Sequence, residues 1–273
     1  MNLFSAEETT RNYCEAGIKK CAMSAPRLLV LGLLSGLIIA FGASVTNVAA
    51  HNFESVALVR VVSGLLFPFG LIMVVLTGAE LFTGNCLITI SLLEKRVTFA
   101  AMLRNLAIVY IANFAGSILV AAGCAFFGQF DYSAGGLAVY TIKLAAAKCT
   151  LGFGKAFVFG IFCNMLVTLG VLLSLSAKDV AGRFFGAYMP VCMFTICGFE
   201  HSVANMYYIP AGLLALRVPG YADLAAAAGI DVGSLTWGSF LGGNLLPVTL
   251  GNVVGGVAVA FIFWFAWMRK ESK

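Results

Sequence analysis

Long uncharged runs, each about as long as a hydrocarbon core is thick, recur along the chain. Four of them hold about 20 residues, enough to cross a bilayer as a helix; they are residues 28–50, 61–79, 105–130 and 156–177. A longer run covers residues 232–268, and its part from about residue 245 is a sixth candidate span. This pattern predicts a chain that crosses a membrane several times.

Two glutamates interrupt the apolar pattern in matching surroundings. Glu80 and Glu200 both lie in the motif G-x-E-x-x-x-x-N, which ends at Asn85 and at Asn205. A short apolar run follows each motif, at 81–93 and 202–216, too short to span alone and best interpreted as a half-helix. Interrupted helices at corresponding positions are a sequence indicator of a transport site near the bilayer midplane. Ionisable groups at such depth are expensive and are usually functional.

The spacing of these motifs predicts an inverted repeat. Residues 27–130 and 156–268 each hold three crossings, with the second and fifth helices interrupted. A second match, N-x-x-G at Asn113 and at Asn252, occurs in the same order in each half. The predicted fold class is therefore an all-α integral membrane protein with six transmembrane helices. Residues 131–155 form the connection between the repeats.

Composition agrees with a membrane protein. Hydrophobic residues make up 61% of the 273 positions and charged residues only 11%, and the mean hydropathy is +0.97. A soluble domain carries about 25% charged residues, so a soluble fold is excluded. The eight cysteines contain no CxxC pair and predict neither a disulfide framework nor a metal site. No cofactor is expected.

Basic residues predict the orientation. With six spans, both termini share one side, and that side collects 12 of the 17 lysines and arginines. The positive-inside rule places it in the cytoplasm. Residues 1–26 then form a cytoplasmic amino-terminal segment, interpreted as an amphipathic helix on the membrane surface, and 269–273 a cytoplasmic tail. The other five basic residues face outward: Arg60, Lys143, Lys148, Lys155 and Arg217.

At its most specific motifs the chain resembles the formate/nitrite transporter family. The resemblance rests on residues 80–83, 198–206 and 247–252, and on Lys148 standing 16 residues before Asn164. It implies an aquaporin-like six-helix protomer, a homopentamer in the bacterial inner (plasma) membrane, and one pore per protomer for small monovalent anions. Membrane lipids are the other expected partners, and nucleic acid is not expected. Overall similarity favours the family's hydrosulfide-channel branch.

Three polar side chains are the candidate pore site. His201 lies in the second break, where its imidazole could donate a hydrogen bond or a proton to a small anion; the alternative is a structural histidine bonded to a neighbouring carbonyl. Thr83 would supply a hydroxyl from the facing segment, and Asn252 an amide that orients His201 or bonds Thr83. Glu80 and Glu200, with Asn85 and Asn205, are assigned a structural role, the carboxylates capping the half-helices that follow them.

The resemblance also indicates where the pore narrows and how anions are attracted. The residues matching the family's constrictions are Phe67, Leu71, Leu81, Phe82, Val167 and Phe194. Lys148, with Lys143 and Lys155 nearby, would supply an external positive field that raises the local anion concentration; the alternative for these lysines is contact with lipid headgroups.

Two other functions compete with an anion channel. An aquaporin-type pore for water or neutral solutes would share the shape, but the paired Asn-Pro-Ala signature is absent from the sequence. An intramembrane enzyme using Glu200 and His201 is the third hypothesis. It is disfavoured because only one of the two histidines lies at membrane depth and no G-x-S-x-G motif occurs.

Overall fold

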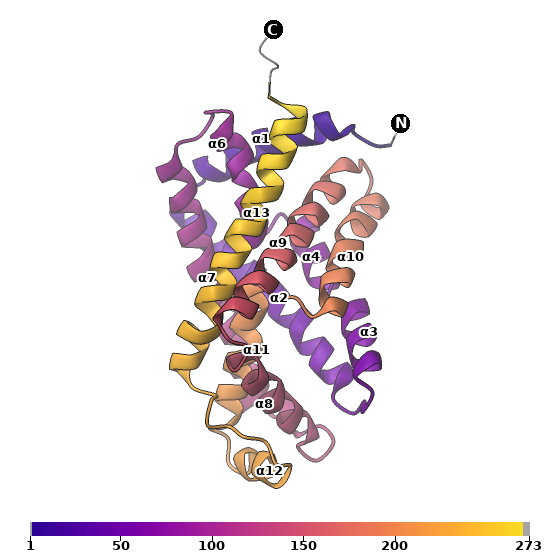
Figure 1. Cartoon of the computed structure of the whole chain (residues 1–273), viewed down its shortest axis with the longest axis vertical. Coiled ribbons are helices and arrows are strands. Elements are labelled where there is room, and N and C mark those ends of the chain that lie inside the picture. The colour runs from indigo at the N-terminus through magenta and orange to yellow at the C-terminus, as the bar shows by residue number, and fades with distance from the viewer. Residues whose placement is uncertain (1, 270–273) are drawn as a thin grey trace.

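The structure, a computed structural model, describes residues 2–269 and is helical apart from its connections (Figure 1). Six of its helices are long and apolar enough to cross a membrane, as predicted. These spans are α2 (Ala25–Ala50), α3 with α4 (Val56–Leu66 and Phe69–Thr77), α7 (Phe99–Phe126), α9 (Phe153–Ser176), α10 (Val180–Cys197), and η3 with α13 (Ser239–Leu245 and Leu246–Trp267). Of the predicted tail, residues 270–273 lie outside the described residues.

Capping residues set the ends of these spans, which differ from the ends of the uncharged runs. The second span begins at Val56, not at 61, because Ser55 accepts a hydrogen bond from Leu58 N and starts the helix. Thr98 caps α7 in the same way, so the third span begins at Phe99 and not at 105. Each helix therefore begins before an arginine, Arg60 or Arg104, whereas the uncharged run begins only after it.

The two predicted breaks are present and have the same backbone geometry. α4 ends at Gly78 and α10 at Gly198, both in the left-handed region with φ of 71° and 72°. A glycine adopts this conformation at little cost and commonly ends a helix. After the first break the chain continues through α5 (Phe82–Asn85), η1 (Cys86–Ile88) and α6 (Thr89–Leu93), and after the second through α11 (Ser202–Ala215).

Small residues pack the same helix pair in each half. α2 lies against α7 in the first repeat, where a Cβ at Gly36 or Gly116 would collide with the backbone of the partner helix. α9 lies against α13 in the second, where Gly251 and Gly255 are equally close to the α9 backbone. Close backbone approach through small residues is a common mode of membrane helix packing. The inverted repeat is thus built around two glycine-packed helix pairs.

The remaining helices lie at the two ends of the bundle. α1 (Ala6–Ala22) and the C-terminal end of α13 mark one end, called the α1 face; α8 (Gly136–Cys149) and α12 (Tyr221–Ala227) mark the other, the α8 face (Figure 1). α8, which packs on α11, occupies most of the predicted connection, after the short η2 (Gln129–Asp131).

The amino-terminal helix was correctly predicted, but it packs on protein. A capping box between Ser5 and Glu8 starts α1, and its buried side covers α6 and α9. Tyr13 donates a hydrogen bond to the Gly84 carbonyl at 3.0 Å, so α1 contacts the segment that follows the first break. A helix lying only on the membrane surface would leave these groups unburied.

Replacing Gly116 with valine should destabilise the protein, because the added side chain meets the Leu33 carbonyl of α2. Overpacking of this kind typically costs about 1–3 kcal/mol. Gly123→Val is the matched control, since it lies in the same helix and a Cβ there meets nothing within 4 Å. Thermal unfolding in detergent should separate the two variants, and equal melting temperatures would contradict the packing argument.

Candidate functional site

A very small apolar cavity lies where the two breaks approach each other. Its volume is about 10 Å³, roughly the minimum that holds one water molecule. Five of the six predicted constriction residues line it together with His201, and Ile39 and Val191 complete the wall. The predicted residues that line it are Phe67, Leu71, Leu81, Val167 and Phe194. This space leaves no room for a hydrated ion.

Phe82 does not line this chamber. Its ring packs edge-on against Tyr110 of α7, with ring centroids 4.8 Å apart. A constriction at Phe82 stays a prediction.

His201 is the polar group of the chamber wall and bonds to Thr83 on the opposite half. The imidazole Nε2 and the Thr83 Oγ1 are 2.9 Å apart, and both side chains are buried. The Phe67 and Phe194 rings flank the imidazole, with centroid distances of 6.5 and 6.0 Å. The sequence-predicted pair is thus brought together across 118 residues of chain.

The hydrogen bonds of His201 fix which ring nitrogen carries the proton. Nδ1 accepts a hydrogen bond from Ala204 N at 3.0 Å and so caps α11. An accepting Nδ1 is unprotonated, which leaves the proton of a neutral imidazole on Nε2. Nε2–H then donates to the Thr83 oxygen, and the Thr83 hydroxyl proton is free to point at a substrate. The histidine thus has a structural role through Nδ1, and through Nε2–H it orients the Thr83 hydroxyl.

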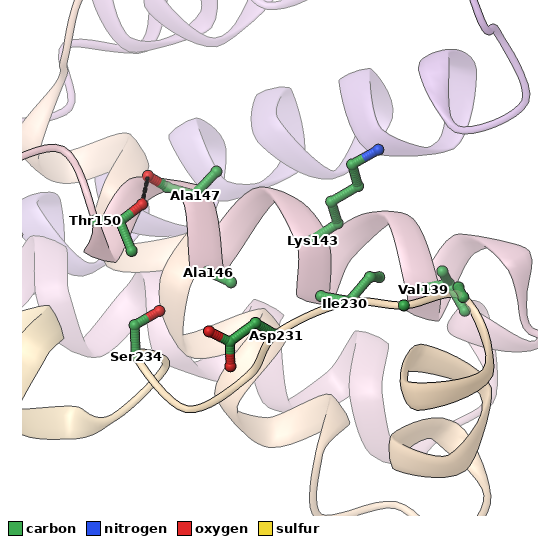
Figure 2. Close-up of a pocket in the computed structure, with 10 residues that line it drawn as sticks. Val139, Lys143, Ala146, Ala147, Thr150, Ile230, Asp231 and Ser234 are labelled. Atoms are coloured by element: carbon green, nitrogen blue, oxygen red, sulfur yellow. Dashed lines mark hydrogen bonds between the residues drawn. The ribbon is translucent and has the colours of Figure 1, made fainter.

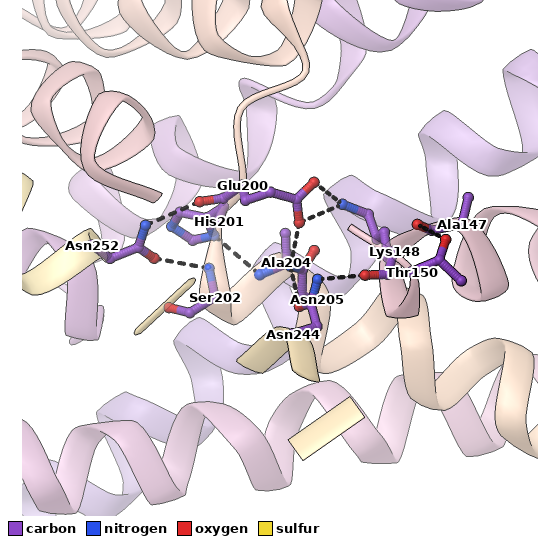
Figure 3. Close-up of polar contacts among 10 residues, drawn as sticks. All are labelled: Ala147, Lys148, Thr150, Glu200, His201, Ser202, Ala204, Asn205, Asn244 and Asn252. Carbon is purple, nitrogen blue, oxygen red and sulfur yellow. Dashed lines mark hydrogen bonds and ion pairs between the residues drawn. The ribbon is translucent and has the colours of Figure 1, made fainter. Parts of the chain in front are cut away.

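Asn252 stabilises the break and not the imidazole directly. Its Nδ2 donates to the carbonyls of Gly160 and Glu200, at 2.8 and 3.0 Å, and its Oδ1 accepts from Ser202 N at 2.9 Å. It does not bond Thr83, one of its two expected roles, because these backbone partners occupy its amide. It nevertheless positions His201 by holding the residues on both sides of it (Figure 3).

Asn113 performs the same task in the first half. Its Nδ2 donates to the carbonyls of Gly32 and Glu80, and its Oδ1 accepts from Phe82 N. The two N-x-x-G matches in the sequence are therefore the two clamps of the repeat. The residue between the clamped positions is Leu81 in the first half and His201 in the second, so only one break presents a polar ring.

The glutamates do not cap the half-helices, contrary to the sequence prediction. Glu200 accepts two hydrogen bonds from Lys148 Nζ, at 2.8 and 3.0 Å, and one from Asn205 Nδ2 (Figure 3). Glu80 accepts one from Lys20 Nζ at 2.6 Å and one from Asn85 Nδ2 at 2.7 Å. A buried carboxylate without a charged partner costs more free energy than a helix end without a cap, so the glutamates pair with the lysines. α11 is capped by His201 instead.

Each of these networks is closed by one further asparagine that the sequence analysis missed. Asn244 accepts from Asn205 and donates to the Lys148 carbonyl, and Asn105 accepts from Asn85 and donates to the Lys20 carbonyl. Lys20 was missed as well. Extending the repeat to a lysine 60 residues before Glu80, as Lys148 stands 52 before Glu200, would have found it.

The predicted lysine group does not act as one unit. Lys148 is paired with Glu200 and only 14% exposed, so its charge is largely compensated. Lys155 is exposed over the Phe159 ring. Lys143 lines a separate surface cavity of about 470 Å³ between α8 and the segment before η3, together with Asp231 (Figure 2). That cavity does not include the residues of the chamber.

Within residues 2–269, no group of three histidine, cysteine or acidic side chains is placed to hold a metal. The geometry defines a class of protein: a multi-pass membrane protein with an inverted repeat whose two broken helices meet at a small apolar cavity. This is the architecture of a transport protein or channel.

Comparison with known proteins identifies the family. A sequence profile of the formate/nitrite transporter family matches residues 7–266. The chain is 34% identical to a probable formate transporter of Methanothermobacter thermautotrophicus, over 98% of both chains. It is 32% identical to the formate channel BtFdhC of Bacillus thuringiensis, over 99% of this chain and 98% of that one. A solved pentameric formate channel with formate bound has a TM-score of 0.78 at 30% identity, covering 90% of this chain and 98% of that one.

The chain belongs to the formate/nitrite transporter family. Its relatives are transporters and channels and not enzymes, which confirms the preference for a transport function over an intramembrane enzyme.

A double-mutant cycle should show that Lys148 and Glu200 form one buried unit. Lys148→Met or Glu200→Gln alone leaves an unpaired buried group and should lower the free energy of unfolding by about 3–5 kcal/mol. The double variant should lose clearly less than the sum of the two. Lys143→Met, on the exposed side of the same helix, is the control and should change little. Additive losses in detergent unfolding would contradict the pairing.

Proposed function

We propose that the protein is a homopentameric channel for small monovalent anions of weak acids, with one pore in each protomer. The observation that carries the proposal is the hydrogen bond between Thr83 and His201, whose imidazole lines a small apolar chamber. The relatives named as formate channels, and the pentameric one with formate bound, support both the substrate class and the assembly.

The chamber restricts the form in which a substrate crosses. Moving a bare charge into an apolar site costs many kcal/mol unless polar groups or neutralisation compensate. A cavity of about 10 Å³ cannot hold a hydration shell. The Thr83 hydroxyl, oriented by the Nε2–H of His201, is the donor that could replace water there, and a weak acid can also cross in its neutral form. A chloride ion has only the first of these routes.

Within this class we favour hydrosulfide as the substrate, with formate and nitrite as the other candidates. Hydrosulfide has a single heavy atom and is polarizable, so it needs the smallest opening of a chamber this narrow. Formate is supported instead by the names of the relatives. The alternative of a water or neutral-solute pore has less support, since apolar side chains surround the one imidazole of the chamber and offer water no continuous chain of partners.

The proposed setting is the plasma membrane of a bacterium, with both termini in the cytoplasm. α1 and the C-terminal end of α13 lie at one end of the bundle (Figure 1). The excess of basic residues at this α1 face supports a cytoplasmic location. The α8 face is then external.

Purified protein in liposomes should carry hydrosulfide and formate faster than chloride. The flux should rise as the pH falls, because the fraction of neutral acid grows. His201→Ala should lower the flux of each substrate by about tenfold, the effect of losing one hydrogen bond of about 1.4 kcal/mol. His51→Ala is the matched control, since the other histidine lies at the surface and bonds Val48 O and Ser133. Equal flux in both variants would refute a central role for His201.

Osmotic swelling of the same liposomes tests the alternative. Rapid water permeation without anion flux would favour the neutral-solute pore.

Widening the chamber should weaken selectivity. Leu71→Ala or Leu81→Ala removes an apolar wall and lets water accompany the ion, so the ratio of hydrosulfide to chloride flux should fall several-fold. Leu76→Ala is the control, because Leu76 lies in the same helix as Leu71 but is 42% exposed. An unchanged flux ratio in the chamber variants would show that selectivity arises elsewhere.

A further inference from the structure

Arg60 is, beside Lys148, a second basic residue of the α8 face that lies against the second break. It belongs to α3, and its guanidinium covers Gly198, the residue that ends α10. A Cβ added at Gly198 would lie 2.5, 2.9 and 3.0 Å from Nη1, Cζ and Nη2 of Arg60. Gly78, which has the same conformation at the first break, would meet nothing within 4 Å. The guanidinium is therefore a feature of one break only.

The charge of Arg60 is uncompensated in the structure. Within residues 2–269 its guanidinium has no hydrogen bond and no ion pair, and the side chain is exposed. Lys148, by contrast, forms an ion pair with Glu200. An arginine presents five N–H donors in a planar fork, and at Arg60 all five remain available to an incoming ligand.

Helix geometry places Arg60 above the chamber. Residues 60, 64, 67 and 71 repeat at the spacing of one helix face, and Phe67 and Leu71 line the chamber. At 1.5 Å per residue, Arg60 lies about 10 Å along the helix from Phe67, on the side of the α8 face. Lys148 lies near the same break, because its Nζ bonds Glu200, two residues after Gly198. Arg60 and Lys148 thus lie at the same break, on the side of the α8 face.

We propose that Arg60 captures the substrate anion at the α8 face before it passes the Phe67 and Phe194 rings. Its positive charge raises the local concentration of any anion, as a charged entrance does. Its planar fork also matches anions with two oxygens, such as formate and nitrite, which it binds with two parallel N–H···O bonds. This inference rests on the proposed anion channel and names the group that loads it.

Two variants separate the effect of the positive charge of Arg60 from the effect of its planar guanidinium. Arg60→Gln removes both, and Arg60→Lys keeps the charge but loses the fork. For substrate added at the α8 face, Arg60→Gln should raise the half-saturating concentration of formate and of hydrosulfide by about threefold or more, with little change in maximal flux. It should also make the flux less sensitive to salt, which screens exposed charges over about 8–10 Å. Arg60→Lys should restore hydrosulfide but not formate.

Arg217→Gln is the matched control, because it removes the same charge from an exposed arginine on the same face. Equal effects of Arg217→Gln and Arg60→Gln, or a half-saturating concentration that Arg60→Gln leaves unchanged, would overturn the proposal. So would a lower maximal flux together with a lower melting temperature, the result expected if Arg60 only stabilises the end of α10. If Arg60→Gln does not assemble, the test is Arg60→Lys alone, whose half-saturating concentration should rise for formate and not for hydrosulfide. Wild-type protein that carries neither anion would refute the proposed function itself and not the placement of Arg60.

Discussion

The fold depends on satisfying the backbone groups that two broken helices expose inside a membrane. No water is available there to bond a free N–H or carbonyl, so each must find a protein partner. Asn113 and Asn252 meet part of this requirement. Each bonds one N–H and one carbonyl of a break, and a further carbonyl of the first helix of its repeat. Both are fully buried, and each comes from the last helix of its own repeat. Without these clamps an extended segment at membrane depth would be too costly to maintain.

A symmetric frame carries an asymmetric site. The clamps, the Lys–Glu pairs and the glycines at the ends of α4 and α10 occur in both halves. The residues held between the clamped positions differ, Leu81 in one half and His201 in the other. Arg60 covers the second break alone. The repeat therefore supplies stability, and the differences between its halves supply the chemistry of the pathway.

The buried charges belong to the frame more than to the pathway. Glu80 and Glu200 are each paired with a lysine and an asparagine, so neither presents a net negative charge to an anion. This pairing explains how an anion channel tolerates two carboxylates at membrane depth. It also removes Lys148 as a simple source of positive field. Attraction of anions then depends on basic groups without an acidic partner, and the position of Arg60 gives it that role.

The sequence by itself determined the six spans and the two breaks, and it named His201 and Thr83 as candidate pore residues, because the length of apolar runs, glycine and buried charge are local signals. It placed the start of the second span at residue 61, because the uncharged run begins only after Arg60. In the structure Ser55 starts the helix earlier. Only the tertiary structure assigned the partners: Lys20 to Glu80, Asn252 to the backbone around His201, and Arg60 to Gly198. These contacts join residues far apart in the chain, and which polar groups meet is decided by helix packing, which no local pattern encodes.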